Sequence, residues 1–267
     1  MPPTPVVLTT AARPIRLAVV GPDGRMGAAI IALAAGDPDF EVVVQVVATA
    51  EMDGLLIDAV DPHSVDVLVD LSHRDAITGH AAWVGRTGVT WVLGTTGLTA
   101  HDQELVAAAA ETAVVFQATN FSIGVALLAD LSARASRLLG TATDVEIIET
   151  HHSDKVDAPS GTALTLAAAV AGARGQRLDE VLRSGRDGLV GARPQGEIGV
   201  HAIRLAGIVG RHSVHFGWPG EGLQLGHEAL DRSVFARGAL RAVHFAVDRA
   251  SAARHGLCGM TELVAVD

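Results

Sequence analysis

The chain has 267 residues and a formal net charge of −10, from 30 acidic against 20 basic residues. This length suits two modest domains, while the acidity and an aromatic content of 3% argue against a nucleic-acid partner. No apolar run approaches the roughly 20 residues that cross a bilayer, so we expect no membrane partner.

Cysteine content and the N-terminal residues indicate where the protein works. The single cysteine, Cys258, excludes an internal disulfide. The first residues, Met-Pro-Pro-Thr-Pro, lack the basic start and the apolar stretch of a secretion signal, so we expect a cytoplasmic protein. Residues 1–14 carry four prolines without a usable period and predict a flexible leader.

A glycine-rich turn follows the first predicted strand. The apolar run Ile15–Val20 leads into Gly21–Gly27, spaced G-x-x-G-x-x-G, and a helix is predicted over Ala28–Ala35. Strand, glycine turn and helix in this order indicate a dinucleotide site, for which we expect NADH or NADPH as cofactor. The first glycine would make the tight bend, the second would admit the pyrophosphate, and the third would let the helix pack on the strand.

The next segment leaves the choice between the two cofactors open. A second strand is predicted over Phe40–Val47, and a carboxylate for the ribose is expected about 20 residues beyond the last glycine. Positions 46–48 carry no carboxylate, unless Glu51 or Asp53 reaches back. Arg25 is the one nearby cation that could meet a 2′-phosphate.

Three more strands follow in the first half of the chain. They are predicted over Val65–Leu71, Val89–Leu93 and Ala113–Gln117. Their alternation with helical segments predicts a right-handed, doubly wound parallel sheet. Ser72 is predicted to cap a helix, and a long helix over Ile123–Leu139 leads into a second domain.

The stretch Glu149–Ala163 concentrates ionisable and backbone-shaping residues. A strand predicted over Asp144–Glu149 would deliver His151, His152 and Lys155 to a loop at its end. Two imidazoles and one ammonium suit a small substrate that carries carboxylates and needs a proton.

A helix start follows this loop directly. Pro159 favours extended backbone before it, and Ser160 stands at the N-cap of a helix predicted over Thr162–Ala173. The backbone N–H groups of Gly161 and Thr162 would then lie at the positive end of the helix dipole. Such a position predicts a site for an anion, here a carboxylate.

Two other interpretations of this stretch stay open. The histidine pair with Asp154 could ligate a metal ion, although none of the standard ligand spacings is present. A solvated polar loop would explain the charges but not the Pro-Ser-Gly-Thr helix start that follows them.

The last third of the chain predicts a group of strands. A loop is predicted over Arg183–Gly196, followed by strands over Ile198–Ala206, Arg211–Trp218 and Leu223–Glu228. Strands that follow one another without helices indicate an open, antiparallel-rich sheet, with one face for helices and one for another subunit. A helix over Phe235–Arg249 is expected to return to the first domain.

Several of these motifs resemble one enzyme family. The run H-H-x-x-K-x-D-x-P-S-G-T-A, which begins at His151, resembles the signature of the 4-hydroxy-tetrahydrodipicolinate reductase (dihydrodipicolinate reductase) family. The G-x-x-G-R-M-G turn and the Gly94–Gly97 loop are also similar to family segments. The D-F-T-x-P segment of the family is matched imperfectly, because Leu71, Ser72 and Arg74 stand where it has Phe, Thr and Pro. The resemblance runs from about residue 15 to residue 264.

The resemblance implies a fold and a domain plan. We expect an α/β protein with an N-terminal Rossmann-like doubly wound parallel sheet and a C-terminal α+β domain with an open mixed sheet. Residues 15–122 and 233–267 would bind the dinucleotide, and residues 123–232 would bind the substrate and form the oligomer. The family also implies a homo-oligomer, a tetramer.

The resemblance implies an activity as well. The protein would reduce 4-hydroxy-tetrahydrodipicolinate to tetrahydrodipicolinate with NAD(P)H, in lysine and diaminopimelate biosynthesis. His151 and Lys155 would be catalytic, as proton donor and substrate-activating cation. His152 would bind one substrate carboxylate, and Gly161 with Thr162 the other. The cofactor-binding residues would be Gly21, Pro22, Asp23, Gly24, Arg25, Met26, Gly94, Thr95, Thr96, Ala118, Thr119, Asn120 and Phe121.

Three alternatives to this activity stay open. The chain could reduce a different cyclic imine, or it could be a non-catalytic ligand-binding protein of the same fold, which the missing ribose carboxylate suggests. A metal-dependent hydrolase that uses the histidine pair is the third.

Overall fold

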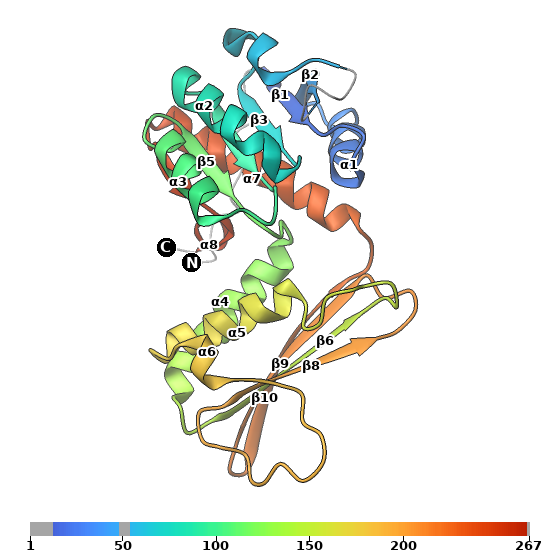
Figure 1. Cartoon of the computed structure of the whole chain (residues 1–267), viewed down its shortest axis with the longest axis vertical. Coiled ribbons are helices and arrows are strands. Elements are labelled where there is room, and N and C mark those ends of the chain that lie inside the picture. The colour runs from blue at the N-terminus through green and yellow to red at the C-terminus, as the bar shows by residue number, and fades with distance from the viewer. Residues whose placement is uncertain (1–12, 48–53, 266–267) are drawn as a thin grey trace, which may run out of the picture. The chain divides into compact units, whose positions relative to one another are not determined.

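A computed structural model describes residues 13–47 and 54–265, and these residues form two compact units (Figure 1). The first unit contains the described residues as far as Phe121, together with Phe235–Leu263. The second is formed by Ser122–Val234 together with Val264 and Ala265.

The first unit is built on a six-stranded sheet with the order β11-β5-β4-β3-β1-β2, in which all neighbouring strands are parallel. Helices and strands alternate along the chain, and the expected Rossmann-like doubly wound fold is confirmed. The strands are β1 (Ile15–Val20), β2 (Phe40–Val46), β3 (Val67–Asp70), β4 (Thr90–Leu93), β5 (Val114–Gln117) and β11 (Gly256–Cys258).

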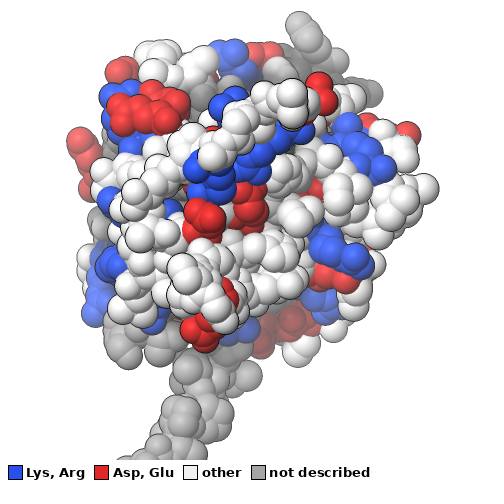
Figure 2. All heavy atoms as spheres, turned by 90° about the horizontal axis from the view of Figure 1, so that it is seen from below, with Lys and Arg blue, Asp and Glu red and all other residues white. Residues whose placement is uncertain are grey.

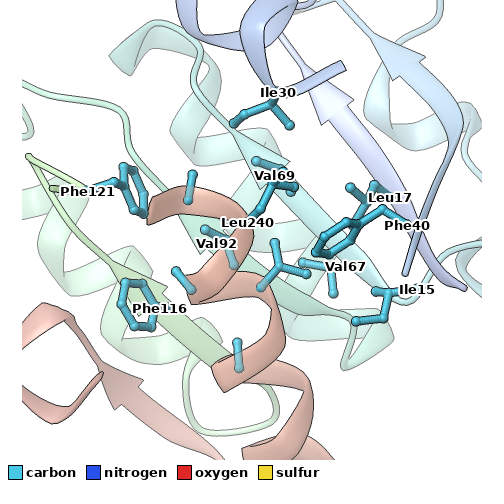
Figure 3. Close-up of a cluster of buried hydrophobic side chains, with 14 of the residues drawn as sticks. Ile15, Leu17, Ile30, Phe40, Val67, Val69, Val92, Phe116, Phe121 and Leu240 are labelled. Carbon is cyan, nitrogen blue, oxygen red and sulfur yellow. The ribbon is translucent and has the colours of Figure 1, made fainter. Parts of the chain in front are cut away.

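Helices cover both faces of this sheet. The helices α1 (Arg25–Ala34) and α7 (Ser233–Ser251) pack on one face, and α2 (Ile77–Thr87) and α3 (Ala100–Ala109) pack on the other. Figure 3 shows the first of these cores, where side chains from the strands and from α7 converge. Burial on both faces explains the near-continuous apolar runs of the strands. Short helical turns complete the unit: η1 (Ile57–Ala59), η2 (Pro62–Ser64), η3 (Arg74–Ala76) and α8 (Met260–Val264).

The predicted cap at Ser72 is wrong. The turn η3 begins after His73, whose side chain accepts from the backbone N–H of Asp75. The hydroxyl of Ser72 instead donates to the carboxylate of Asp70, over 2.6 Å. A short polar side chain can form a hydrogen bond within its own loop in this way instead of capping a helix.

The second unit contains a five-stranded sheet with the order β10-β9-β6-β8-β7. The strand β9 pairs antiparallel with β6 and β10, whereas β8 pairs parallel with β6 and β7. The expected open mixed sheet is therefore confirmed, but its description as antiparallel-rich overstates it. The strands are β6 (Asp144–His151), β7 (Leu182–Ser184), β8 (Ile198–Arg204), β9 (Gly210–Trp218) and β10 (Glu221–Ala229).

The parallel pairing of β6 with β8 follows from the helices between these two strands. The segment from β6 to β8 contains α5 (Gly161–Ala173) and α6 (Leu178–Val181), and parallel strands need a crossover of this length. The loop predicted from Arg183 is wrong at its start, because Arg183 and Ser184 belong to β7. Three residues are too few to give an alternating pattern.

Two helices cover one face of this sheet. The helices α5 and α4 (Ile123–Leu139) bury Leu128 and Leu166 against strand residues such as Ile147 and Val214. Within the second unit, residues that alternate with these on the strands are more exposed. Ile203 on β8, for example, is 46% exposed.

Charged side chains of the second unit form mixed pairs. Arg186 and Arg193 both donate to the carboxylate of Glu146 on β6, over 2.7 and 3.0 Å. Figure 2 shows Lys and Arg atoms lying next to Asp and Glu atoms on the face seen from below. Among the described helices, none combines the length and the apolar character that a bilayer span needs.

Candidate active site

The junction of β6 and α5 has the capped helix start that the sequence predicts. Ser160 is the N-cap of α5, and its hydroxyl accepts from the backbone N–H of Ala163 over 3.1 Å. The helix begins at Gly161, one residue earlier than predicted. A side chain at Gly161 would meet no atom within 4 Å, so a ligand has open access to the positive end of the helix.

A buried carboxylate lies beside His151 on the same strand. The Nδ1 atom of His151 is 2.6 Å from a carboxylate oxygen of Glu149, and Glu149 is fully buried. Two guanidinium nitrogens of Arg204 and the backbone N–H of Ser160 donate to the same carboxylate. Burial raises the pKa of Glu149, but these hydrogen bonds outweigh it and hold that pKa below its ordinary value.

A second imidazole lies next to this pair. His212 on β9 is opposite Glu149 in the register of the sheet, and its ring stands edge-on to that of His151, with the ring centres 5.1 Å apart. Its Nε2 atom is 3.2 Å from the hydroxyl oxygen of Ser160. Burial, followed by the charges of His151 and other nearby groups, lowers the pKa of His212 to about 4. The ring is therefore neutral at physiological pH.

The other two predicted cationic residues lie in the loop between β6 and α5. The Nε2 atom of His152 is 3.4 Å from a guanidinium nitrogen of Arg232. Lys155, which is the only lysine in the chain, places Nζ 2.7 Å from a carboxylate oxygen of Asp157. The hydrogen bond from Lys155 lowers the pKa of Asp157. The ammonium has three donors, so this pair leaves it able to bind a substrate group.

The described residues offer little to a metal ion. No group of three or more His, Cys, Asp or Glu side chains among residues 13–47 and 54–265 is arranged to hold one. His151 contacts the carboxylate of Glu149, which already accepts from the guanidinium of Arg204, and the neutral imidazole of His212.

The glycine turn of the first unit has the shape that a dinucleotide phosphate needs. Gly21 adopts a φ of +73°, which favours glycine, and Gly24 is the N-cap of α1 without a capping side chain. A Cβ atom at Gly27 would overlap the carbonyl oxygen of Gly21. The third glycine therefore allows the helix to close on the turn rather than on the strand. The first N–H groups of α1, at Arg25 and Met26, lack an intrahelical acceptor.

The remaining predicted cofactor residues divide into exposed and buried ones. Thr96 and Thr119 are exposed, but the hydroxyl of Thr95 points to Asp70 and the ring of Phe121 stacks on Phe116. Both of these side chains are almost fully buried, so only their backbone is available to a ligand. The other predicted residues of these loops, Gly94, Ala118 and Asn120, lie at the carboxyl ends of β4 and β5.

A buried pair supports these loops. Asp70, at the end of β3, lies 2.7 Å from Nδ1 of His80 on α2, and both side chains are buried. The expected ribose carboxylate is absent where the structure describes the chain, because Val46 and Val47 are buried apolar residues. Glu51 and Asp53 lie outside the described residues.

Four residues of this site were not predicted: Glu149 as a partner of His151, and Arg204, His212 and Arg232. The position of Glu149 two residues before His151 places both on one face of the strand, and this spacing could have identified it. Arg204 and His212 come from other strands, and only the sheet register brings them here.

Known proteins resemble the chain over both units. The profile described as "Dihydrodipicolinate reductase, N-terminus" matches residues 15–121, and "Dihydrodipicolinate reductase, C-terminus" matches residues 124–264. The chain is 40% identical over 257 residues to the 4-hydroxy-tetrahydrodipicolinate reductase of Roseobacter denitrificans, covering 90% of this chain and 94% of the relative. The corresponding protein of Rubrobacter xylanophilus is 38% identical over 264 residues, covering 94% and 98%.

A solved structure shows the same fold. The dipicolinate-bound dihydrodipicolinate reductase from Paenisporosarcina sp. TG-14 superposes with a TM-score of 0.75 at 26% identity. The match covers 94% of this chain and all of that structure.

Proposed function

Because the chain belongs to the dihydrodipicolinate reductase family, we infer that it is an NAD(P)H-dependent oxidoreductase that reduces 4-hydroxy-tetrahydrodipicolinate to tetrahydrodipicolinate. The reaction adds a hydride and a proton, and a hydroxyl group leaves as water. It serves lysine and diaminopimelate biosynthesis.

The arrangement at the β6–α5 junction carries this proposal. It places His151 at the end of β6 and His152 and Lys155 in the loop that follows, before a helix whose first residue, Gly161, is open to a ligand. A substrate with two carboxylates requires two anion-binding groups. His152 binds one carboxylate, and the backbone of Gly161 and Thr162 binds the other.

His151 and Lys155 are assigned to the chemical step. His151 is held by a carboxylate at Nδ1, which leaves Nε2 to exchange a proton with the substrate. Lys155 stabilises negative charge that develops on the substrate. A general acid and an oriented cation each commonly contribute a factor of about 10² to 10⁴.

The first unit fits a nicotinamide dinucleotide. When bound, this cofactor supplies the hydride. The turn Gly21–Met26 would hold the pyrophosphate, because Gly21 and Gly24 have no side chain there and Gly27 allows α1 to close on the turn. The loops at Gly94–Thr96 and Ala118–Phe121 would contact it mainly through backbone groups.

Four further assignments belong to the proposal. Residues 15–122 and 233–267 form the cofactor domain, and residues 123–232 form the substrate domain. The chain forms a homotetramer, which the uncovered face of the second sheet supports, and it works in the cytoplasm with either NADH or NADPH.

The test follows the oxidation of the nicotinamide cofactor at 340 nm. Freshly generated 4-hydroxy-tetrahydrodipicolinate is added to the protein with each cofactor in turn. Oxidation that depends on the intermediate supports the proposal. If the protein binds a cofactor but does not oxidise it when this substrate is added, it is a ligand-binding homologue and not this reductase.

A further inference from the structure

The carboxylate of Glu149 has all its acceptor positions filled. Its Oε2 atom accepts a hydrogen bond from Nη1 of Arg204 over 2.9 Å and lies 2.6 Å from Nδ1 of His151. Its Oε1 atom accepts hydrogen bonds from Nη2 of Arg204 and from the backbone N–H of Ser160, both over 3.0 Å. A fully buried carboxylate with four donors is fixed in position and remains ionised.

An ionised carboxylate determines which nitrogen of His151 carries the proton. A carboxylate only accepts hydrogen bonds, so Nδ1 must be the protonated nitrogen of a neutral ring. His212 stands edge-on to the ring and packs against one side of it. Gly210 lies near Nε2 and leaves it room, because a Cβ atom there would come within 3.1 Å of that nitrogen. Nε2 has no hydrogen-bond partner within the described residues and the side chain keeps 11% exposure.

We propose that Glu149 is a positioning residue, which fixes the Nδ1–H tautomer and the orientation of His151 so that Nε2 faces the substrate. The expected effect of Glu149 on kcat rests on the proposed function. The tautomer of His151 does not, because it follows from the hydrogen bonds alone. Arg204 acts through Glu149, because its fork donates to both carboxylate oxygens and fixes their plane.

The substitution Glu149→Gln tests this role with little change in volume. Glutamine has one acceptor oxygen and one NH2 group. The backbone N–H of Ser160 can only donate a hydrogen bond. The amide oxygen is therefore expected at the Oε1 position, and the NH2 group is expected to face His151. Nδ1 would then accept rather than donate, and the ring would change to the Nε2–H tautomer.

Nitrogen-15 NMR of histidine-labelled protein reads the tautomer directly. In the wild type, at a pH where the ring is neutral, we expect Nδ1 of His151 to carry the proton. Assignment uses the signals lost in His151→Asn. A wild-type ring protonated at Nε2 overturns the inference, and this measurement needs no Glu149 variant to fold.

Kinetics give the second readout. We expect Glu149→Gln to lower kcat by about 100-fold while KM changes little, and we expect Glu149→Asp to recover part of the loss. The matched control is Glu146→Gln on the same strand, whose carboxylate pairs with Arg186, Arg193 and His201 away from the site. Equal losses in the two Gln variants would overturn a positioning role.

The outcomes separate the inference from the function on which it rests. A wild-type protein without reductase activity refutes the proposed function, whereas the tautomer experiment still decides the role of Glu149. An active wild type whose kcat is unaffected by Glu149→Gln refutes the inference alone.

Discussion

The Nε2 atom of His212 lies 3.2 Å from the hydroxyl oxygen of Ser160, so a buried imidazole on β9 supports the residue that caps α5. The Nδ1 atom of the same ring is buried without a hydrogen-bond partner in the described part of the chain. A neutral ring tolerates this position better than a charged one. The cap of the proposed substrate helix therefore depends on the protonation of His212.

This dependence predicts a loss of stability in acid. The pKa of His212 is about 4 in the folded protein, below its ordinary value of 6.5. Burial is the main cause. The charges of His151, His227 and Lys155 lower this pKa further, while the charge of Glu149 raises it. The unfolded chain therefore binds the proton first as the pH falls. Stability from this group is complete above about pH 6.5 and is lost toward pH 4, by about 3 kcal/mol in total.

Urea unfolding at pH 7 and at pH 4.5 measures this loss in the wild type and in His212→Gln. The glutamine can keep a hydrogen bond to Ser160 but has no titrating group. The variant should lose less stability between the two pH values than the wild type. The same loss in both proteins would show that His212 does not titrate as expected.

Removal of the ammonium of Lys155 should affect turnover more than binding. We expect Lys155→Ala to lower kcat by about 10² to 10⁴-fold, with a smaller change in KM. Arg177→Ala is the matched control, because it removes an exposed cation that is also paired with an aspartate, Asp179. Steady-state kinetics of both variants check this. A similar fall in kcat for Arg177→Ala would contradict the role of Lys155.

The single lysine allows the same role to be tested in the unaltered protein. An acylating reagent for amines can modify only the side chain of Lys155 and the chain's α-amino group. Mass spectrometry of the modified protein should show activity falling in step with modification at Lys155. A dicarboxylate analogue such as dipicolinate should slow both. Full activity after complete modification of Lys155 would be inconsistent with its proposed role.

The glycine turn makes its own prediction for cofactor binding. A methyl group at Gly27 would overlap the carbonyl oxygen of Gly21, so we expect Gly27→Ala to distort the turn at a cost of about 1–3 kcal/mol. NADH and NADPH should bind at least about tenfold more weakly. In the control Gly36→Ala, the nearest atom is 3.7 Å from the new methyl group. Fluorescence titration that gives Gly27→Ala the affinity of the wild type would refute the role of the turn.

The sequence predicts most of the fold because local signals agree with the final structure. The helix α4 is predicted to the residue, since Ser122 caps its start and Gly140, with a φ of +72°, ends it. The first strand, β1, is equally clear because its apolar run meets a glycine turn. By contrast, β7 and β11 have three residues each, and neighbouring strands rather than sequence pattern hold them.

The site is less predictable than the fold. His151, His152 and Lys155 lie together in the sequence, and the Ser160 cap after them has a clear pattern. Arg204 is 55 residues from Glu149, and their contact depends on the parallel register of β6 and β8. The local sequence also cannot show that Thr95 and Phe121 turn their side chains inward, because burial depends on how the loops pack.

Transfer of deuterium from the cofactor to the product tests the central claim most directly. The protein is incubated with 4-hydroxy-tetrahydrodipicolinate and nicotinamide cofactor that is deuterated at the transferring carbon, and the products are analysed by mass spectrometry. We expect tetrahydrodipicolinate that carries one deuterium from the matching cofactor stereoisomer. Oxidised cofactor without deuterium in the product from either stereoisomer, or no tetrahydrodipicolinate at all, would contradict the account.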